Sequence, residues 1–328
     1  MESFLYHYIR SMRLYYGFVT MTTALLGVAF ARTQLGDASF IFGKTIIVLA
    51  IAFLAWGVNQ IFSDYFDRKE DAINAPHRPM VTGALKPKPA LTLSAVLMLL
   101  IGVSSFMLSP YAFLFLVIGG LLNIAYSCLK RVPVLNCIVY ACAISCCFPF
   151  AYAGVADKVP DVFTSIIILL FVFPAHFLMC HNSYFKDVKG DEAAGVRTLQ
   201  TLFSPVVARY VSWIVGGLFL LLHYIIVFGI TFFEEDPLSD AHRQLIILLY
   251  FQLGLEAILF AFFMHEIKHQ RFHNATRLNC QWCVSMMYML MMYMLLMPYP
   301  IQWLFPVLEI LSLLAIQLLF RWYRDEKE

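Results

Sequence analysis

Three aspartates follow an apolar segment early in the chain, at a spacing that could do chemistry. The stretch from Asn59 to Gly83 reads NQIFSDYFDRKEDAINAPHRPMVTG and contains Asp64, Asp67 and Asp71. Offsets of three and seven residues put the three carboxylates on one face of a helix. Because like charges on one face repel one another, we expect a cationic partner to join them there.

A second acidic stretch follows another apolar segment in the middle of the chain. Residues 181–199 read HNSYFKDVKGDEAAGVRTL, in which Asp187 and Asp191 are four residues apart and share a helical face. Basic residues accompany both stretches: Arg68, Lys69, Arg78, Lys186, Lys189 and Arg197. Mg²⁺ takes one or two carboxylates together with substrate phosphates. The two stretches therefore predict a site for Mg²⁺ and a diphosphate, with these metal ligands: Asp64, Asp67, Asp71, Asp187 and Asp191.

The composition of the chain places these stretches in a membrane protein. Of the 328 residues, 61% are hydrophobic and 13% are charged, and the mean hydropathy is +0.75. Soluble domains are about 45–50% apolar and about 25% charged. The net charge is only +2, and no basic tract suggests a nucleic-acid partner. We therefore expect a polytopic protein whose acidic stretches lie at the mouth of a cavity in the lipid bilayer.

Apolar runs of about 20 residues predict the membrane-spanning helices. Ten candidates are found, at roughly 14–31, 41–62, 90–108, 110–128, 133–154, 161–183, 205–232, 243–265, 279–297 and 301–320. Only Met297 to Pro300 separates the last two, so one hairpin or one broken helix would reduce the number. The prediction is an all-α bundle of nine or ten transmembrane helices, formed by residues 1–328 as a single domain.

The basic residues predict the orientation of the bundle. If the N-terminus is cytoplasmic, every Lys and Arg falls in a cytoplasmic segment except Arg32, Lys44, Lys158 and Arg243. An excess of Lys and Arg marks cytoplasmic loops in membrane proteins. Both acidic stretches are therefore expected on the cytoplasmic side.

The first acidic stretch resembles the signature of the UbiA superfamily of intramembrane prenyltransferases. That signature is roughly NDxxDxxxD followed by a loop containing Arg-Pro, and the chain has three aspartates in that register and then Arg78-Pro79. The second stretch is similar to the family's second motif, with KDxxGD at 186–191 and GxxTL at 195–199. Residues 126–131 resemble its YxxxKR turn, through Tyr126, Lys130 and Arg131.

The resemblance implies a helical bundle around a central cavity and a Mg²⁺-dependent ionisation of a polyprenyl diphosphate. A small acceptor, commonly an aromatic acid, phenol or quinone precursor, would then attack the allylic cation. It implies that the five aspartates hold the metal ions. The substrate-binding residues that we expect are Arg78, Lys130, Lys186, Arg131, Tyr126 and Asn59. Ser63 stands where many members have Asn, and Asn59 lies one helical turn before it.

Three alternatives to prenyl transfer remain open. A terpene cyclase of the same superfamily would ionise the same donor, and the donor's own double bond would attack the cation. A carrier for lipid-linked or anionic solutes would use the aspartates for ion coupling and release no diphosphate. A CDP-alcohol phosphotransferase also has an Asp-rich membrane motif, but its DG and AR elements are missing beside Asp64.

Several further polar residues lie in or beside apolar segments. His265, His269 and His273 would share a face if that stretch were helical and could then bind a metal, although a hydrated basic loop is the simpler interpretation. The CxxC of Cys280 and Cys283 has no second pair nearby, so we interpret these cysteines as packing residues. Buried polar positions without a predicted role are His176, Glu256, Glu309 and Asn123.

Overall fold

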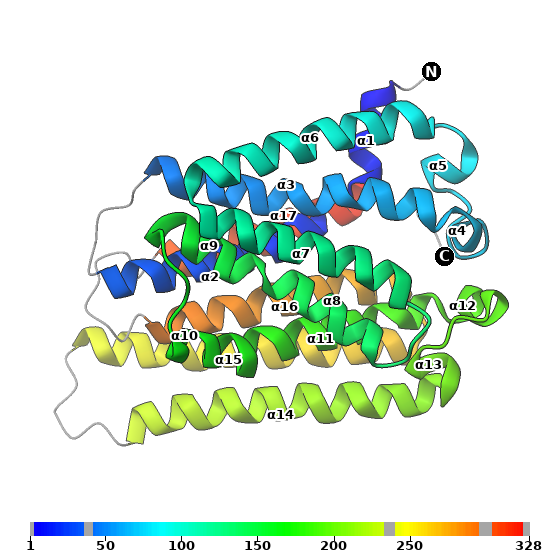
Figure 1. Ribbon diagram of the computed structural model, residues 1–328. Coiled ribbons are helices and arrows are strands. Elements are labelled where there is room, and N and C mark those ends of the chain that lie inside the picture. Colours follow the sequence, from blue (N-terminus) through cyan, green and yellow to red (C-terminus); the bar gives the residue numbers. More distant parts are fainter. Residues whose placement is uncertain (1–2, 36–41, 233–239, 295–303, 324–328) are drawn as a thin grey trace.

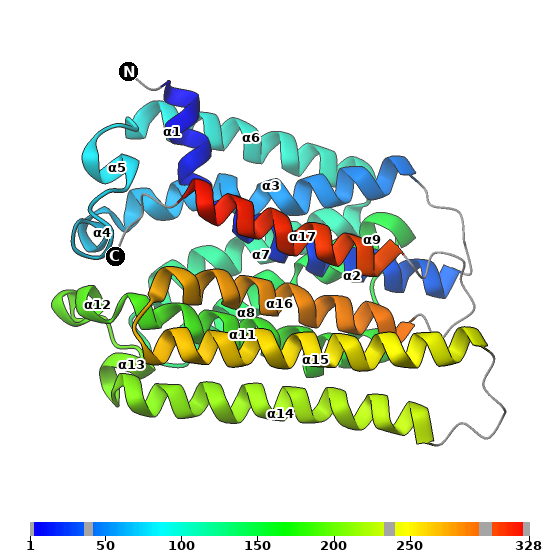
Figure 2. The same ribbon diagram turned by 180° about the vertical axis from the view of Figure 1, so that it is seen from behind.

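The computed structural model describes residues 3–35, 42–232, 240–294 and 304–323. All regular elements in these ranges are helices, as predicted. The long helices run alongside one another, and α1 (Phe4–Ser11) and the end of α17 (Leu304–Trp322) lie at the same end of the bundle (Figures 1 and 2).

The long helical segments follow the predicted apolar runs closely. In chain order they are α2 (Tyr15–Leu35), α3 (Phe42–Phe66), α6 (Pro87–Leu108), α7 (Pro110–Leu129), α8 (Leu135–Ser145) continued by α9 (Cys147–Ala156), α10 (Val162–Ile167) continued by the π-helix η1 (Ile168–Val172) and α11 (Phe173–Ser183), α14 (Pro205–Phe232), α15 (Asp240–Lys268), α16 (Phe272–Met294) and α17. Proline stands first in α6, α7 and α14, where its missing N–H costs no intrahelical bond.

The number of helices apolar enough to cross a membrane is eight in the described residues, or nine if α1 and α2, which meet at 54°, form one bent span. Helix α16 has 23 residues, yet it does not belong to this set. Every residue from Leu278 to Met292 is buried, because α2, α11, α15 and α17 surround this helix. A helix without lipid contact needs no lipid-compatible composition, so its polar residues are tolerated. Residues Met297 to Pro300, which separate the last two predicted spans, lie outside the described residues.

Short helices cap one end of the bundle. They are α4 (Arg68–Asn74), α5 (Pro79–Thr82), the 3₁₀-helix η2 (Tyr184–Lys186), α12 (Val188–Ala194) and α13 (Leu199–Leu202). Figure 1 shows α4, α5, α12 and α13 together beyond the same ends of the long helices. Because α4 packs against α12, the two acidic stretches meet although more than a hundred residues separate them in the sequence.

The cap rests on a tightly packed core in which α2 contacts α3, α9 and α16. Gly27 is a point of close approach between α2 and α9, since a Cβ atom there would lie 2.3 Å from the Phe148 carbonyl oxygen. Only glycine allows the two backbones to approach this closely. Gly217 in α14 is the opposite case, because a Cβ atom there would meet no atom within 4 Å.

We predict that Gly27→Ala lowers the free energy of unfolding of the purified protein by about 1–3 kcal/mol, and with it the melting temperature, because the methyl group must push two helices apart. The matched substitution Gly217→Ala should cause no loss. Melting curves of both variants in one detergent test this packing. Equal melting temperatures for the two variants would contradict it.

Candidate functional site

The first acidic stretch forms a bent extension of α3. Asp67 lies between α3 and α4 with φ −85° and ψ 6°, and the amide N–H of Asp71 still donates to the Asp67 carbonyl at 2.8 Å. Asp187 takes a similar conformation between η2 and α12, with φ −98° and ψ 0°, and the Asp191 N–H donates to its carbonyl at 2.9 Å. The two motifs therefore share a local geometry: a bend at one aspartate, Asp67 or Asp187, and a further aspartate one turn later, Asp71 or Asp191.

Cationic side chains from distant segments join the first set of aspartates. The Arg13 guanidinium donates to Oδ1 of Asp64 at 2.6 Å, and Gln60 Nε2 donates to the same oxygen at 3.1 Å. Arg13 lies between α1 and α2 with φ 46°, so the bend that separates these helices also directs this residue toward α3. Asp64 is only 2% exposed, and such a buried carboxylate requires this pairing.

Arg78 links Asp64 to Asp71. Its Nη1 atom lies 3.8 Å from Asp64 Oδ1 and forms a short ion pair with Asp71 Oδ1. Burial raises the pKa of the Asp71 carboxyl, against the opposing effect of Arg78 and Arg13. The second oxygen of Asp71, Oδ2, is buried and accepts no hydrogen bond from the described residues. A buried carboxylate oxygen without a hydrogen-bond partner is compatible with a cation ligand.

The prediction that one helical face holds all three aspartates is therefore only partly right. Asp64 and Asp71 both contact Arg78, whereas Asp67 pairs with Lys130, which follows α7. The bend at Asp67 turns this carboxylate toward a different part of the fold.

Lys130 is the point where the two acidic stretches converge. Its Nζ atom lies 3.3 Å from Asp67 Oδ2. Burial alone would lower the pKa of this ammonium group, but neighbouring carboxylates outweigh burial and raise it. They are Asp67, Asp187, Asp191 and Asp71. The lysine therefore carries its charge among carboxylates from both motifs.

Side chains of the surrounding helices hold the second stretch in place. Asn182 donates to Asn279 Oδ1 of α16 at 3.1 Å and accepts from the Ser212 hydroxyl of α14 at 2.7 Å. Gln200 donates to the His181 carbonyl at 2.7 Å. These buried contacts fix the position from which Lys186 and Asp187 extend.

Both stretches line one open cavity, which we call the acidic cavity; its volume is about 930 Å³ with the open space at its mouth included. Of the predicted site residues, those that line it are Asp67, Asp71, Asp187, Asn59, Arg78, Lys130, Lys186 and Tyr126. Asp64 and Asp191 are buried behind it, and Arg131 is exposed outside it. The polar wall also includes Arg13 and Gln60, which the sequence patterns did not indicate.

Aromatic rings form the inner wall of the acidic cavity. The hydroxyl groups of Tyr126 and Tyr184 lie 2.9 Å apart. The Tyr126 ring is 5.4 Å from that of Tyr140, which is 5.8 Å from the Trp56 ring. The Trp56 ring is in turn 5.5 Å from that of Tyr16. Tyr126 was expected from its motif, but the other rings come from four separate helices and have no common sequence pattern.

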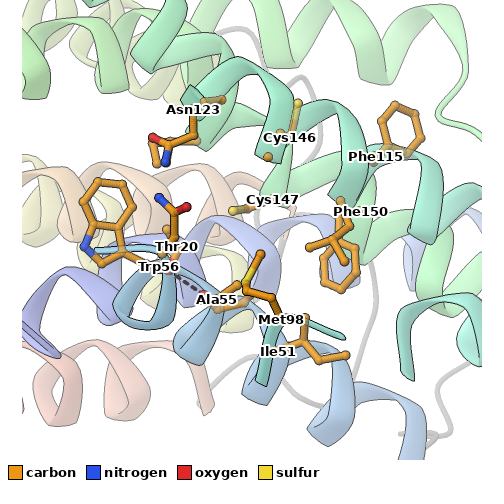
Figure 3. Close-up of a pocket in the computed structure, with 17 residues that line it drawn as sticks. Thr20, Ile51, Ala55, Trp56, Met98, Phe115, Asn123, Cys146, Cys147 and Phe150 are labelled. Carbon is orange, nitrogen blue, oxygen red and sulfur yellow. Dashed lines mark hydrogen bonds between the residues drawn. The ribbon is translucent and has the colours of Figure 1, made fainter. Parts of the chain in front are cut away.

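A second space, the apolar pocket, adjoins the acidic cavity between the long helices. Trp56, Asn59 and Asn123 line both spaces. The pocket has a volume of about 650 Å³ with its open space included, and it lies between α2, α3, α6, α7, α8 and α9. In Figure 3, Trp56 and Asn123 lie at one end and Phe115 and Phe150 at the other. The site thus combines a charged mouth with an apolar interior.

The donor set of the acidic cavity fits a hard divalent cation. The described residues contain no group of three or more His, Cys, Asp or Glu side chains close enough to hold a metal ion by themselves. Mg²⁺ does not require one, because substrate phosphates and water complete its shell. Asp67, Asp71 and Asp187 line the cavity and would supply carboxylate oxygens to such a shell, and Oδ2 of Asp71 has no hydrogen-bond partner among the described residues.

The remaining sequence candidates lie apart from the acidic cavity. Helix α15 ends at Lys268, so His265, His269 and His273 do not share one helical face, and His273 packs on Phe320 instead. Cys280 and Cys283 are buried thiols in α16, as expected of packing residues. His176 is also buried, 3.0 Å from Thr23 Oγ1.

The two intramembrane glutamates have polar partners within the bundle. Glu256 lies 2.8 Å from Nδ1 of His223, and Glu309 accepts from Gln252 at 2.7 Å and from Ser285 at 2.8 Å. These contacts join α14 to α15 and α15 to α16 and α17. The glutamates therefore stabilise helix packing in the second half of the bundle.

Comparison with known proteins agrees with this geometry. The profile described as "UbiA prenyltransferase family" matches residues 20–264. The bacteriochlorophyll synthase 33 kDa chain of Rhodobacter capsulatus is 29% identical over 186 residues, 53% of this chain and 61% of that protein. The 4-hydroxybenzoate octaprenyltransferase of Aliivibrio fischeri is 30% identical over 189 residues, 56% of this chain and 63% of that protein. The digeranylgeranylglyceryl phosphate synthase of Natronomonas pharaonis is 30% identical over 162 residues, 48% of this chain and 57% of that protein. The matched stretch thus spans less than two thirds of these relatives.

Solved structures share the fold at low sequence identity. A UbiA homolog from Aeropyrum pernix K1 aligns with a TM-score of 0.65 and 15% identity over 85% of this chain and 98% of that chain. A UbiA homolog from Archaeoglobus fulgidus bound to GPP and Mg²⁺ aligns with a TM-score of 0.61 and 15% identity over 86% of this chain and 99% of that chain. The predicted all-helical membrane bundle is therefore confirmed.

We predict that Arg13→Gln lowers the free energy of unfolding by about 3 kcal/mol, because Asp64 then remains buried without its closest partner. Adding Asp64→Asn removes the buried carboxylate that has lost its partner, so it should recover part of the lost free energy of unfolding. Thermal or denaturant unfolding in detergent measures both effects. If Asp64→Asn lowers the free energy of unfolding further in the Arg13→Gln background, Arg13 does not stabilise the protein by pairing with the buried Asp64 carboxylate.

Proposed function

The chain belongs to the UbiA prenyltransferase family, and from that premise we propose that it transfers a prenyl group from a polyprenyl diphosphate to a small acceptor within the membrane. The predicted resemblance to this family is confirmed. The observation that carries the proposed reaction is the junction of two spaces: an acidic cavity lined by both aspartate motifs adjoins an apolar pocket, with Trp56, Asn59 and Asn123 lining both. That junction matches a substrate with a charged head and an apolar tail.

We assign the diphosphate and its metal ions to the acidic cavity. Asp67, Asp71 and Asp187 would hold Mg²⁺ directly, and the buried Asp64 and Asp191 would support the negative potential behind them. When bound, Mg²⁺ would neutralise the charge that develops on the leaving diphosphate. The UbiA homolog from Archaeoglobus fulgidus has been solved with GPP and Mg²⁺ and with DMAPP and Mg²⁺.

Basic side chains of the same cavity would bind the remaining phosphate oxygens. Arg78 offers a planar fork, whereas Lys130 and Lys186 offer compact charges. Arg78 and Lys130 now pair with Asp71 and Asp67, so they are already oriented toward the cavity. These pairs would exchange part of their mutual contact for contacts to the diphosphate and its metal ions.

The prenyl tail would occupy the apolar pocket. Its wall consists of aliphatic, aromatic and thiol side chains, with Thr20, Asn59 and Asn123 as its polar members. Such a lining excludes water, which would otherwise capture the allylic cation. At the junction, the faces of Trp56, Tyr126 and Tyr140 would stabilise the cation through their quadrupoles.

The acceptor would react at this junction, where the allylic carbon leaves the diphosphate. The relatives named above act, by their names, in the synthesis of bacteriochlorophyll, of prenylated 4-hydroxybenzoate and of a glyceryl phosphate lipid. We favour an aromatic or quinone-precursor acceptor, which would place the chain in quinone biosynthesis. We also propose that the whole chain acts as one domain with its cap on the cytoplasmic side.

We predict that Asp67→Asn or Asp187→Asn lowers Mg²⁺-dependent release of diphosphate from a prenyl diphosphate by at least about 100-fold, since each removes a carboxylate that faces the leaving group. The purified protein is assayed in liposomes with several prenyl chain lengths, with and without aromatic acceptors. EDTA should abolish release by the wild type. Mass spectrometry of the organic products identifies what the prenyl group joins.

Asp157→Asn is the matched control for this assay. Asp157 is an exposed residue at the other end of the bundle, and its φ of 51° is a conformation that Asn also adopts. Normal turnover in the Asp67 and Asp187 variants would refute the site. A cyclised product formed without acceptor would establish the terpene cyclase instead. Transport without any diphosphate release would establish the carrier.

We predict that Gly120→Leu impairs long donors selectively. A Cβ atom at Gly120 would meet nothing within 4 Å, and Gly120 lines the apolar pocket, so the leucine would fill space that a tail needs. The KM for a C20 donor should rise about tenfold, whereas a C5 donor should be little affected. Gly217→Leu, equally open but in α14, serves as control. Equal impairment of both donors would place the tail elsewhere.

A further inference from the structure

Two tyrosine hydroxyl groups meet in the wall of the acidic cavity, and the proposed reaction so far uses only the ring of Tyr126. Tyr126 lies near the end of α7, and Tyr184 is the first residue of η2. Both side chains line the acidic cavity, and their hydroxyl oxygens lie 2.9 Å apart. This is an ordinary distance for an O–H···O hydrogen bond, so one of the two hydroxyl groups donates to the other.

This hydrogen bond connects the elements that supply the charged groups of the site. Tyr126 is one helical turn before Lys130, whose Nζ atom lies 3.3 Å from Asp67 Oδ2. Tyr184 is three residues before Asp187. All five side chains line the acidic cavity. The hydrogen bond therefore joins α7 to the second aspartate motif, beside the groups that we assign to the metal ions and the diphosphate.

The surroundings of Tyr184 leave its hydroxyl group one strong partner. Tyr184 is 2% exposed and packs in a cluster with Cys137, Tyr140 and Cys180. The Cys180 thiol lies within hydrogen-bonding reach of both hydroxyl groups, but a thiol is a weak donor and a weak acceptor. Among the described residues, the strong hydrogen-bond partner of Tyr184 is therefore the Tyr126 hydroxyl.

Tyr126 is the more open member of the pair. Its side chain is partly exposed, whereas that of Tyr184 is buried. A tyrosine hydroxyl has one proton and two lone pairs, whereas the oxygens of a metal-bound diphosphate only accept hydrogen bonds. When Tyr126 donates its proton to such an oxygen, it can only accept from Tyr184. A bound diphosphate would therefore fix the direction of the hydrogen bond, with Tyr184 as the donor.

We propose that Tyr184 is a positioning residue that donates to the Tyr126 hydroxyl and so holds the Tyr126 proton toward the diphosphate. This inference rests on the proposed prenyl transfer and adds to it a residue that acts through another residue. No proton is transferred. As negative charge grows on the leaving diphosphate, the hydrogen bond from Tyr126 strengthens, and the bond from Tyr184 to Tyr126 strengthens with it. The pair therefore raises the rate of ionisation more than the affinity for the donor.

The kinetic test is a double-mutant cycle on the full-length protein in liposomes, with a prenyl diphosphate and Mg²⁺. Tyr184→Phe and Tyr126→Phe each keep the ring and remove one hydroxyl group. We expect each to lower the kcat of diphosphate release about tenfold and to leave the KM for the donor within about twofold. Because Tyr184 acts only through Tyr126, the double variant should be no slower than Tyr126→Phe alone.

Tyr288→Phe is the matched control. Tyr288 is a buried tyrosine of α16 whose hydroxyl oxygen lies 3.2 Å from Ser312 Oγ, and it lines neither the acidic cavity nor the apolar pocket. Its substitution should leave kcat unchanged. A normal kcat in Tyr184→Phe would overturn the proposal, and so would a double variant slowed by the product of the two single effects. A wild type that releases no diphosphate would instead refute the proposed function.

A second measurement observes the hydrogen bond without turnover and without Tyr184→Phe. Fluorotyrosine replaces Tyr184 alone, and its fluorine resonance is recorded in detergent before and after addition of magnesium diphosphate at saturating concentration. We expect the resonance to shift in the protein that retains Tyr126 and to stay in place in the Tyr126→Phe background. An equal shift in both backgrounds would show that Tyr184 contacts the diphosphate itself and would overturn the proposal. The absence of a shift in both would also overturn it.

Discussion

The fold brings several carboxylates of like charge together at one end of a membrane bundle, and the rest of the site depends on how that charge is balanced. Asp64 and Asp71 are almost fully buried; Arg13 pairs with Asp64, and the Arg78 guanidinium lies against both carboxylates. Lys130 balances Asp67 and lies near the aspartates of the second motif. Because removing one partner of a buried pair is costly, these contacts tie the bend after α1, the end of α3 and the turn after α7 to one another. On binding, the carboxylates would pair with the metal ions instead of with Arg and Lys, and those basic side chains would pair with the diphosphate.

The same arrangement explains why a membrane scaffold serves this site. The cap places charged groups beyond the ends of the long helices, whereas the apolar pocket lies between those helices. Trp56, Asn59 and Asn123 mark the boundary between the two environments. A substrate with a charged head and an apolar tail can satisfy both at once. The buried helix α16 supports this boundary, since Asn279 holds Asn182 at the base of the second motif.

Much of this could be predicted from sequence because local spacing determines it. The aspartates lie about one turn apart and apolar runs of membrane length flank them, but the bend that turns the Asp67 carboxylate toward Lys130 is not encoded in that spacing. Other features depend on tertiary contacts that no local pattern encodes. In the sequence Arg13 is only one of the basic residues on the predicted cytoplasmic side, and its contact with Asp64 requires the bend before α2. The aromatic wall collects single rings from separate helices, and α16 lacks the hydropathy of a lipid-facing helix because protein surrounds it.

The central claim is that the two aspartate motifs jointly hold the metal ions and diphosphate of a prenyl donor whose tail enters the apolar pocket. Crystals grown with Mn²⁺ and an unreactive geranyl thiodiphosphate test it most directly, because Mn²⁺ is located by its anomalous scattering. We predict anomalous peaks at coordinating distance from Asp67 or Asp71 and from Asp187, with the geranyl chain passing Trp56 toward Phe115. Metal peaks away from both motifs, or a geranyl chain outside the apolar pocket, would contradict the account.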